Sequence, residues 1–258
     1  MKMKKCSLVL TGILTAGVVH ATTYTYDAYV TPNTLPQSIP SSPWTSVGAG
    51  DADTETASGR LLTLSAANDN TPGPYYYAIS GTSGIVDAND EYEIRTRVRV
   101  PSSSSVSPFP DRSLFHAYIG DGTRLVGFGV TNLSANMNAI FLINSGVSPL
   151  VTPYVATLGN DDFFNIRMTK TGTSGGASDT VSLYVDGVLA QSVSYTALSS
   201  YTFPELLFGN SASQPFGLTQ LTGASFGINE AAPALLPEPT TAVMILAGAM
   251  LLMRRYRG

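Results

Sequence analysis

The sequence predicts an all-β domain in which two antiparallel sheets pack as a sandwich. Three observations lead to this prediction. Alternating apolar and polar residues recur along residues 22–236, tight-turn sequences separate the alternating runs, and no run has the 3.6-residue period of an amphipathic helix. Short strands joined by turns are typical of a sandwich, and roughly 200 residues are enough for one such domain.

The clearest strand lies between Glu91 and Val100, where charged and uncharged residues alternate. Successive side chains of a strand point to opposite faces of the sheet, so one face of this strand belongs to the core. The residues predicted to be buried are Tyr92, Ile94, Val98 and Val100, and those predicted to be exposed are Glu91, Glu93, Arg95, Arg97 and Arg99.

The same alternation predicts strands with Phe164, Ile166 and Met168 inside, and with Val181, Leu183 and Val185 inside. Shorter strands are predicted at Leu61–Ser65, Tyr75–Ile79, Ser113–Ile119, Arg124–Val130, Ala139–Ile143, Val188–Tyr195, Leu206–Gly209 and Ala224–Ile228. The Asp-Gly pairs at 186–187 and 121–122 predict type I′ hairpin turns. The Gly- and Ser-rich segment 171–178 predicts a flexible hairpin tip.

The composition restricts the function classes. Charged residues make up 12% of the 258, against roughly a quarter in ordinary soluble domains. A net charge of −4 argues against a nucleic-acid partner, which needs a basic surface. One cysteine and two histidines exclude thiol chemistry and multi-histidine metal sites.

The N-terminal residues 1–21 have the pattern of a secretory signal. Lys2, Lys4 and Lys5 precede an apolar run from Leu8 to Val19, and cleavage is predicted after Ala21. The sandwich domain is then assigned to residues 22–232. Residues 22–236 contain eight basic and 17 acidic residues, a net charge of −9. This excess keeps the exported domain soluble and repels it from anionic surfaces.

The C-terminal residues 233–258 have a different organisation. Pro237-Glu238-Pro239 is followed by an uncharged apolar run over 240–253 and then by Arg254 and Arg255. A helix of this run would be about 21 Å long at 1.5 Å per residue, which is short of a ~30 Å hydrocarbon core. A single short transmembrane helix is therefore expected, with its basic end on the cytoplasmic side.

This C-terminal arrangement resembles the PEP-CTERM sorting signal of exported proteins in Gram-negative bacteria. The resemblance implies that Pro237, Glu238, Pro239, Arg254 and Arg255 are recognised by an exosortase-type sorting enzyme while the chain lies transiently in the inner membrane. It further implies a location at the cell surface or in the extracellular matrix. A plain tail anchor is the alternative.

The middle of the chain resembles the concanavalin A-like, laminin-G-type jelly roll. The resemblance is carried by the hairpin 179–189, by the strand 163–168 before it and by Leu206-Leu207-Phe208-Gly209-Asn210 after it. Tyr26-Asp27, Trp44 and the segment 59–64 resemble the first hairpin of such domains. The complete expectation is a two-sheet antiparallel jelly roll, flanked by a signal helix and a short transmembrane helix.

Some jelly rolls cleave glycans, so paired carboxylates are the residues to consider. A retaining glycosidase places two carboxyl groups about 5–5.5 Å apart. Glu91 and Glu93 are the nearest candidates, but Arg95, Arg97 and Arg99 follow on the same face and would keep both ionised. His116 is the only histidine outside the signal and is expected to be a packed or surface residue of a strand, so serine hydrolysis is not expected either. We therefore expect no catalytic residues, with an atypical glycan-cleaving enzyme as the alternative.

No cofactor and no metal site are expected, although calcium is left open. Its candidate ligands are Asp51, Asp53, Asp121, Asp161 and Asp162, which form no spaced motif. The run Tyr75-Tyr76-Tyr77 could supply a ring for stacking a sugar, and Trp44 is expected in the core. The sequence thus predicts an exported structural or adhesive protein, with exopolysaccharide as its candidate ligand.

Overall fold

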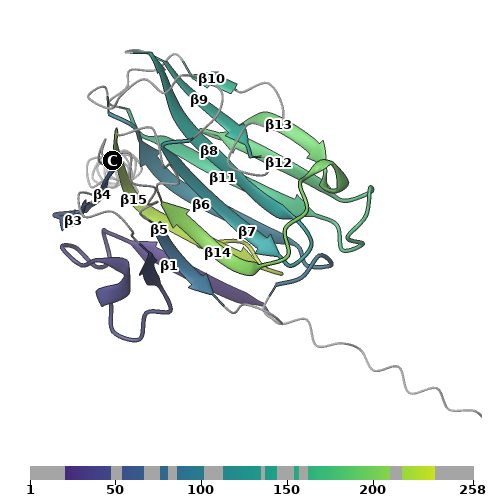
Figure 1. Ribbon diagram of the computed structural model, residues 1–258, viewed down its shortest axis with the longest axis horizontal. Coiled ribbons are helices and arrows are strands. Elements are labelled where there is room, and N and C mark those ends of the chain that lie inside the picture. The colour runs from purple at the N-terminus through teal and green to yellow at the C-terminus, as the bar shows by residue number, and fades with distance from the viewer. Residues whose placement is uncertain are drawn as a thin grey trace, which may run out of the picture.

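The computed structural model describes residues 21–47, 54–66, 76–80, 86–101, 113–134, 137–143, 154–156, 162–209 and 217–235, and these form a two-sheet sandwich (Figure 1). The strands are β1 (Thr22–Asp27), β2 (Thr45–Val47), β3 (Thr54–Ser58), β4 (Leu61–Ala66), β5 (Tyr76–Ser80), β6 (Tyr92–Arg99), β7 (Phe115–Asp121), β8 (Leu125–Ser134), β9 (Met137–Leu142), β10 (Tyr154–Ala156), β11 (Phe164–Thr171), β12 (Thr180–Val185), β13 (Val188–Ser194), β14 (Pro204–Gly209) and β15 (Gly217–Ile228). Two short 3-10 turns, η1 (Pro36–Ser38) and η3 (Tyr195–Ala197), complete the described elements.

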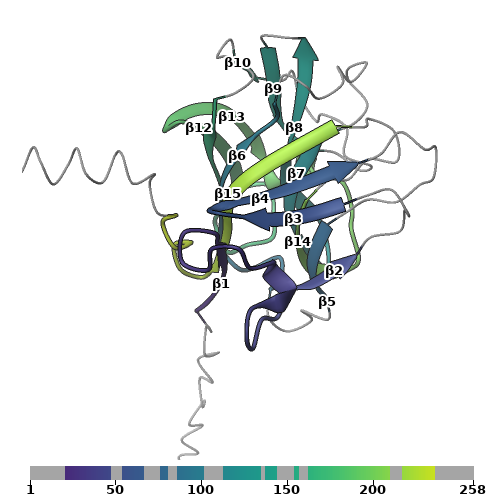
Figure 2. The same ribbon diagram turned by 90° about the vertical axis from the view of Figure 1, so that its left-hand side faces the viewer.

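All strand pairs among the described residues are antiparallel. Sheet A has the order β13-β12-β11-β6-β15-β4-β3, with β1 also paired to β15. Sheet B has the order β10-β9-β8-β7-β14-β5-β2. Strands β3 and β4, at the left in Figure 1, face the viewer in Figure 2. Consecutive strands, such as β7 to β10 and β11 to β13, lie next to each other, but β6 lies beside β15 and β7 beside β14, and such long crossovers are expected for a jelly roll rather than a simple meander.

The core lies between the two sheets and contains the residues that the alternation predicted. Tyr92, Ile94, Val98 and Val100 are each at most 2% exposed, and the apolar residues of β11 and β12 face the same core. Trp44 is 3% exposed and packs edge-on against Phe208. The burial predictions for β6, β11 and β12 and the placement of Trp44 are therefore confirmed.

The predicted exposure of the charged face of β6 is largely wrong. Glu91 is exposed, but Glu93 is only 9% exposed, and Arg95, Arg97 and Arg99 are half-buried. The reason is that β6 lies in the middle of sheet A, between β11 and β15, so side chains of both neighbours cover its outer face. The Phe163 ring, for example, packs beneath both Arg97 and Arg99.

The two Asp-Gly turns differ from each other. Asp186 and Gly187 have φ angles of 49° and 83°, as a type I′ hairpin requires, so this prediction is confirmed. At the other pair the prediction is wrong by one residue, because Asp121 still belongs to β7 and bonds through its backbone to Arg124. The turn is centred on Gly122 and Thr123, and only Gly122 has a positive φ. The Asp121 carboxylate accepts the backbone N–H groups of Thr123 and Arg124, which explains the shift.

The termini fall outside the structural description. Residues 1–20 and 236–258, which contain most of the predicted signal, the Pro-Glu-Pro motif and the apolar run, are not among the described residues. Within the part that is described, no helix has the length and apolar character needed to cross a membrane.

Candidate functional site

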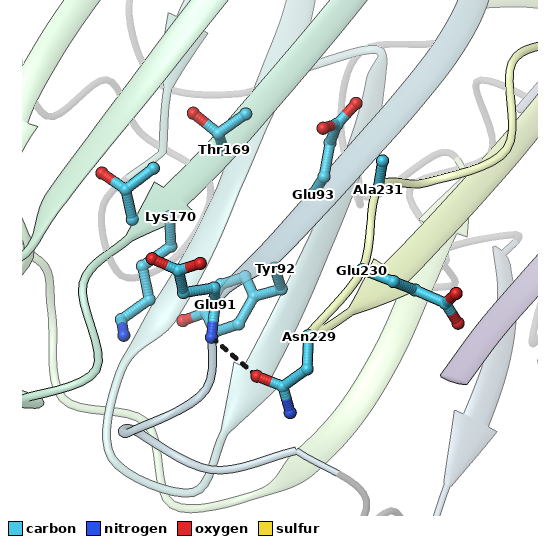
Figure 3. Close-up of a pocket in the computed structure, with 9 residues that line it drawn as sticks. Glu91, Tyr92, Glu93, Thr169, Lys170, Asn229, Glu230 and Ala231 are labelled. Atoms are coloured by element: carbon cyan, nitrogen blue, oxygen red, sulfur yellow. Dashed lines mark hydrogen bonds between the residues drawn. The ribbon is translucent and has the colours of Figure 1, made fainter. Parts of the chain in front are cut away.

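The predicted carboxylate pair lines a hollow of about 210 Å³ where β6 begins and β11 and β15 end. Figure 3 shows that the two carboxylates point in different directions, with Glu93 turned away from Glu91. The backbone N–H of Glu91 donates to Asn229 Oδ1 over 3.2 Å, the dashed line in that figure. The hollow has a third carboxylate, Glu230, which is exposed.

Each carboxylate of the pair has its own partner. Glu93 forms an ion pair with Arg95, and Glu91 Oε1 accepts the backbone N–H of Gly172 over 2.9 Å. A glycosidase needs two carboxyl groups that converge on one bond, one of them protonated. Glu91 and Glu93 therefore do not form a catalytic pair in this arrangement.

Two of the five calcium candidates, Asp121 and Asp162, lie among the described residues. Asp121 is 4% exposed, and its Oδ2 accepts the hydroxyls of Tyr92 and Tyr195 over 2.8 and 2.7 Å. Burial, followed by the interaction with Asp121, raises the pKa of both tyrosines, which therefore remain donors to it. Asp162 is exposed, whereas Asp51, Asp53 and Asp161 lie outside the described residues. The described ranges contain no group of three or more His, Cys, Asp or Glu that could hold a metal ion.

His116 lies on the outer face of sheet B and is only 2% exposed. Its ring stacks on that of Tyr118 with the centroids 5.5 Å apart and the planes at 12°. Burial lowers the pKa of His116 to about 3, and its Nδ1 has no hydrogen-bond partner in the described part of the chain. The imidazole is therefore neutral near neutral pH.

The outer face of sheet B also carries a cluster that the sequence did not reveal. The aromatic cluster consists of Tyr118, Tyr201 and Phe203, with ring centroids 5.8 Å apart between Tyr118 and Tyr201 and 5.8 Å between Tyr201 and Phe203. The Glu205 carboxylate accepts both tyrosine hydroxyls, from Tyr118 over 2.8 Å. Burial and the hydrogen bond to Glu205 raise the pKa of Tyr201 to about 12, so this hydroxyl also remains a donor.

The aromatic cluster depends on Gly120, which has no side chain between β7 and the segment before β14. A Cβ at Gly120 would lie 2.3 Å from the Phe203 carbonyl oxygen and 2.7 Å from the Tyr201 ring. The segment before β14 can therefore lie against β7, which leaves the Phe203 ring 67% exposed at the edge of the cluster. An exposed ring beside fixed polar groups can stack an apolar face of a small molecule while the polar groups orient it.

Of the predicted stacking residues, Tyr76 packs against the same outer-face cluster as Tyr201, whereas Tyr77 lies elsewhere. Tyr77 is completely buried in the core, Tyr76 is half-buried on the outer face, and Tyr75 lies outside the described residues. The signal that could have found the cluster is the alternation of Tyr201, Phe203 and Glu205 directly before and into β14. The sorting residues Pro237, Glu238, Pro239, Arg254 and Arg255 also lie outside the described residues, so their role remains a prediction.

Comparison with known proteins identifies the fold. No protein-family model matches the sequence, and a search of curated proteins finds no relative. A carbohydrate esterase from the Shiga toxin-encoding bacteriophage phi24B has a TM-score of 0.53 at 14% identity, covering 82% of this chain and all of the other. The alginate lyase Aly36B has a TM-score of 0.54 at 12% identity, covering 84% of this chain and 98% of its own.

A peanut lectin is also similar, with a TM-score of 0.48 at 11% identity, covering 81% of this chain and 97% of the lectin. The chain has the two-sheet, jelly-roll-like fold of the esterase and the lyase. Identities this low describe the architecture alone, so ligand and activity have to be argued from this chain's own residues.

Proposed function

We propose that the protein is an exported cell-surface or extracellular-matrix protein with a structural or adhesive role, whose jelly roll binds exopolysaccharide. The observation that carries the glycan part is the aromatic cluster, in which the exposed Phe203 ring lies beside Tyr201 and the Glu205 carboxylate. Two proteins of similar fold are named as a carbohydrate esterase and an alginate lyase, so a glycan ligand is compatible with this architecture. No cofactor is needed for such binding.

The sorting part of the proposal is supported by the sequence. An exosortase-type enzyme would act at Pro237-Glu238-Pro239 while the apolar run lies transiently in the inner membrane of a Gram-negative bacterium. The sandwich would then remain at the cell surface or in the matrix. Its excess of acidic residues keeps it in solution until it meets its ligand.

A glycan-cleaving enzyme is the second candidate, and the names of the two similar structures favour it. The partners of Glu91 and Glu93 oppose it, because neither carboxylate is placed to act with the other. Incubation of the purified protein with exopolysaccharide, followed by measurement of released acid and reducing ends, separates the two candidates. If acid or reducing ends are released only when the protein is present, the result supports the glycan-cleaving enzyme.

Affinity electrophoresis tests the binding function. The full chain, purified in a non-ionic detergent, is run through native gels that contain exopolysaccharide from the producing strain. We expect retardation, and we expect Phe203→Ala to weaken the interaction about tenfold, equivalent to about 1.4 kcal/mol. Val30→Ala is the matched control, because Val30 is 66% exposed and lies outside the cluster. Equal retardation of wild type and Phe203→Ala would refute the assignment of the site.

A further inference from the structure

Four arginines gather on the outer face of sheet A. Arg95, Arg97 and Arg99 alternate along β6, and Arg167 lies on the adjacent strand β11. Residues 22–236 contain only eight basic residues and have a net charge of −9. Half of the positive charge of an acidic domain is therefore concentrated at one place, which we call the arginine patch.

The strand register makes this concentration unfavourable for the domain alone. Arg167 is directly opposite Arg95 in the antiparallel pairing of β11 with β6. Like charges at directly opposed positions of a sheet destabilise it. Arg95 is paired with Glu93, which relieves part of the repulsion. A bound anion between the two guanidinium groups would relieve it further.

The guanidinium groups are already held in place by their neighbours. Arg97 and Arg99 lie over the Phe163 ring, with 5.2 and 4.8 Å between the guanidinium carbon and the ring centroid. Arg99 also donates from Nε to Gln220 over 2.7 Å, and Arg97 donates from Nη1 to Asn165 over 3.2 Å.

Arg167 is oriented in the same way, 4.2 Å above the Tyr184 ring. Because much of the side-chain entropy of these arginines is lost before any ligand arrives, binding costs less. A planar guanidinium held on a ring presents its donors to a carboxylate in pairs.

A hollow of about 250 Å³ lies between the two opposed arginines. Asn165 and Gly187 line one side, and Ala234 and Leu235 line the other. The second wall is fixed to the sheet, because Ser225 donates to the Pro233 carbonyl over 2.7 Å. Enclosed pockets for drug-sized ligands measure about 300–1,000 Å³, so this hollow suits one residue of a chain.

We propose that the arginine patch binds the carboxylate of an acidic, uronate-type polysaccharide, with one sugar residue seated between Arg95 and Arg167. This inference rests on the proposed glycan-binding function, names the chemical class of the glycan, and adds a second contact surface, since the arginine patch lies on sheet A and the aromatic cluster on sheet B. The net charge of −9 disfavours the binding of nucleic acids and anionic membranes, because their dense negative charge would face the whole acidic domain. A polyuronate carries one charge per sugar residue, whereas duplex DNA carries one per about 1.7 Å of its axis, so the acidic domain repels the polyuronate less strongly.

Binding of polygalacturonate to the full chain in non-ionic detergent tests this proposal. Its fully methyl-esterified form is the comparison, since it has the same sugar without the charge. We expect the acid form to bind at least tenfold more tightly, and Arg167→Gln to abolish most of that difference. Arg167→Lys keeps the charge but not the paired donors, and should recover only part of it. Arg60→Gln, an exposed arginine outside the patch, is the matched control.

The outcomes separate this proposal from the proposed function. If the chain binds the strain's exopolysaccharide but Arg167→Gln has no effect on the binding of polygalacturonate, the arginine patch is refuted and the glycan function stands. If neither polymer binds, both fail. Tighter binding to duplex DNA or to phosphatidylglycerol vesicles than to polygalacturonate would also overturn the proposal. Arg95→Gln, which changes the other arginine that lines the hollow, replaces Arg167→Gln if the latter does not fold, as judged by thermal unfolding.

Discussion

The ammonium group of Lys170 lies 3.1 Å from the carboxylate of Asp179, with the two side chains 0% and 2% exposed. Lys170 also donates to the carbonyls of Asp90 and Gly172 over 2.8 and 2.7 Å. Asp179 accepts the Ser174 hydroxyl over 2.6 Å and the Gly175 backbone N–H over 2.8 Å. This buried pair therefore ties the Gly- and Ser-rich hairpin tip to the segment that leads into β6.

Replacing Lys170 by methionine should destabilise the domain strongly. Lys170→Met leaves the Asp179 carboxylate buried without its counter-charge, and breaking such a pair costs about 3–5 kcal/mol. Urea unfolding followed by tyrosine fluorescence measures the loss. Arg60→Met removes an exposed positive charge and should change the stability by less than about 0.5 kcal/mol. Equal urea midpoints for wild type and Lys170→Met would show that the ion pair is unimportant.

His116 should make the stability fall in acid. Burial lowers the pKa of His116 from 6.5 to about 3, so between these values the unfolded chain binds a proton that the folded chain does not. The stability is thus fully present above pH 6.5, and falls by about 1.4 kcal/mol per pH unit as the pH drops toward 3. His116→Gln removes the titrating group, and its free energy of unfolding should have a slope smaller by about one proton. If the free energies of unfolding of wild type and His116→Gln changed with pH in the same way, the burial of His116 would be contradicted.

Asp179 should also make the stability of the domain depend on pH, in a lower pH range than His116. Burial alone would raise its pKa, but hydrogen bonds from Ser174, Lys170 and the backbone outweigh burial and lower the pKa from 3.8 to about 2. The folded carboxylate therefore contributes stability above pH 3.8 that is lost as the pH falls through 2. Asp179→Asn should remove this dependence at a large cost in stability, because Lys170 would be left buried without a counter-charge. An unchanged profile between pH 4 and 2 would rule out this assignment.

Alternation predicted the central strands because their two faces differ in burial. In β11 the same alternation places Lys170 in line with Phe164, Ile166 and Met168, so its burial follows from the pattern although its charge argues against it. The short strands β2 and β10 have three residues each, too few to show a period. In β15 only Ala224–Ile228 was predicted, since the polar residues Thr219, Gln220 and Thr222 interrupt the first half.

The candidate site was harder to predict because its parts are distant in the sequence. Tyr118 and Tyr201 are 83 positions apart and meet only because β7 pairs with β14. The sequence shows the arginines of β6 as one charged face of a strand, and the alternation predicts that this face is exposed to solvent. The opposition of Arg95 and Arg167 depends on the register of β11 against β6, and alternation predicts only the face that each arginine takes, not the residue that lies opposite it.

The turn after β12 offers a test of local backbone strain. Gly187 has a φ of +83°, and nothing lies within 4 Å of the position that a Cβ would take, so only the backbone conformation opposes a side chain there. Gly187→Val should cost about 1–3 kcal/mol, because a β-branched residue resists positive φ. Gly187→Asn should cost less, since asparagine tolerates this conformation. Equal thermal midpoints for the two variants would contradict the type I′ turn.

The last prediction concerns the sorting segment. If Pro237-Glu238-Pro239 is read by a processing enzyme, Glu238→Ala should leave the folded sandwich intact but keep the chain in the inner membrane, with Arg254 and Arg255 on the cytoplasmic side. The two prolines should hold the segment extended and open to that enzyme, because neither continues a helix well. Fractionation of the native host followed by mass spectrometry of the protein measures both release and the C-terminal residue.

Glu230→Ala is the matched control, because it removes an exposed glutamate shortly before the same segment. We expect this variant to be released like the wild type, since the recognised charge is the one between the prolines. Recovery of mature wild-type protein that still ends in residues 254–258 would exclude processing and leave a plain tail anchor. Normal release of Glu238→Ala would show instead that the glutamate is not what the enzyme recognises.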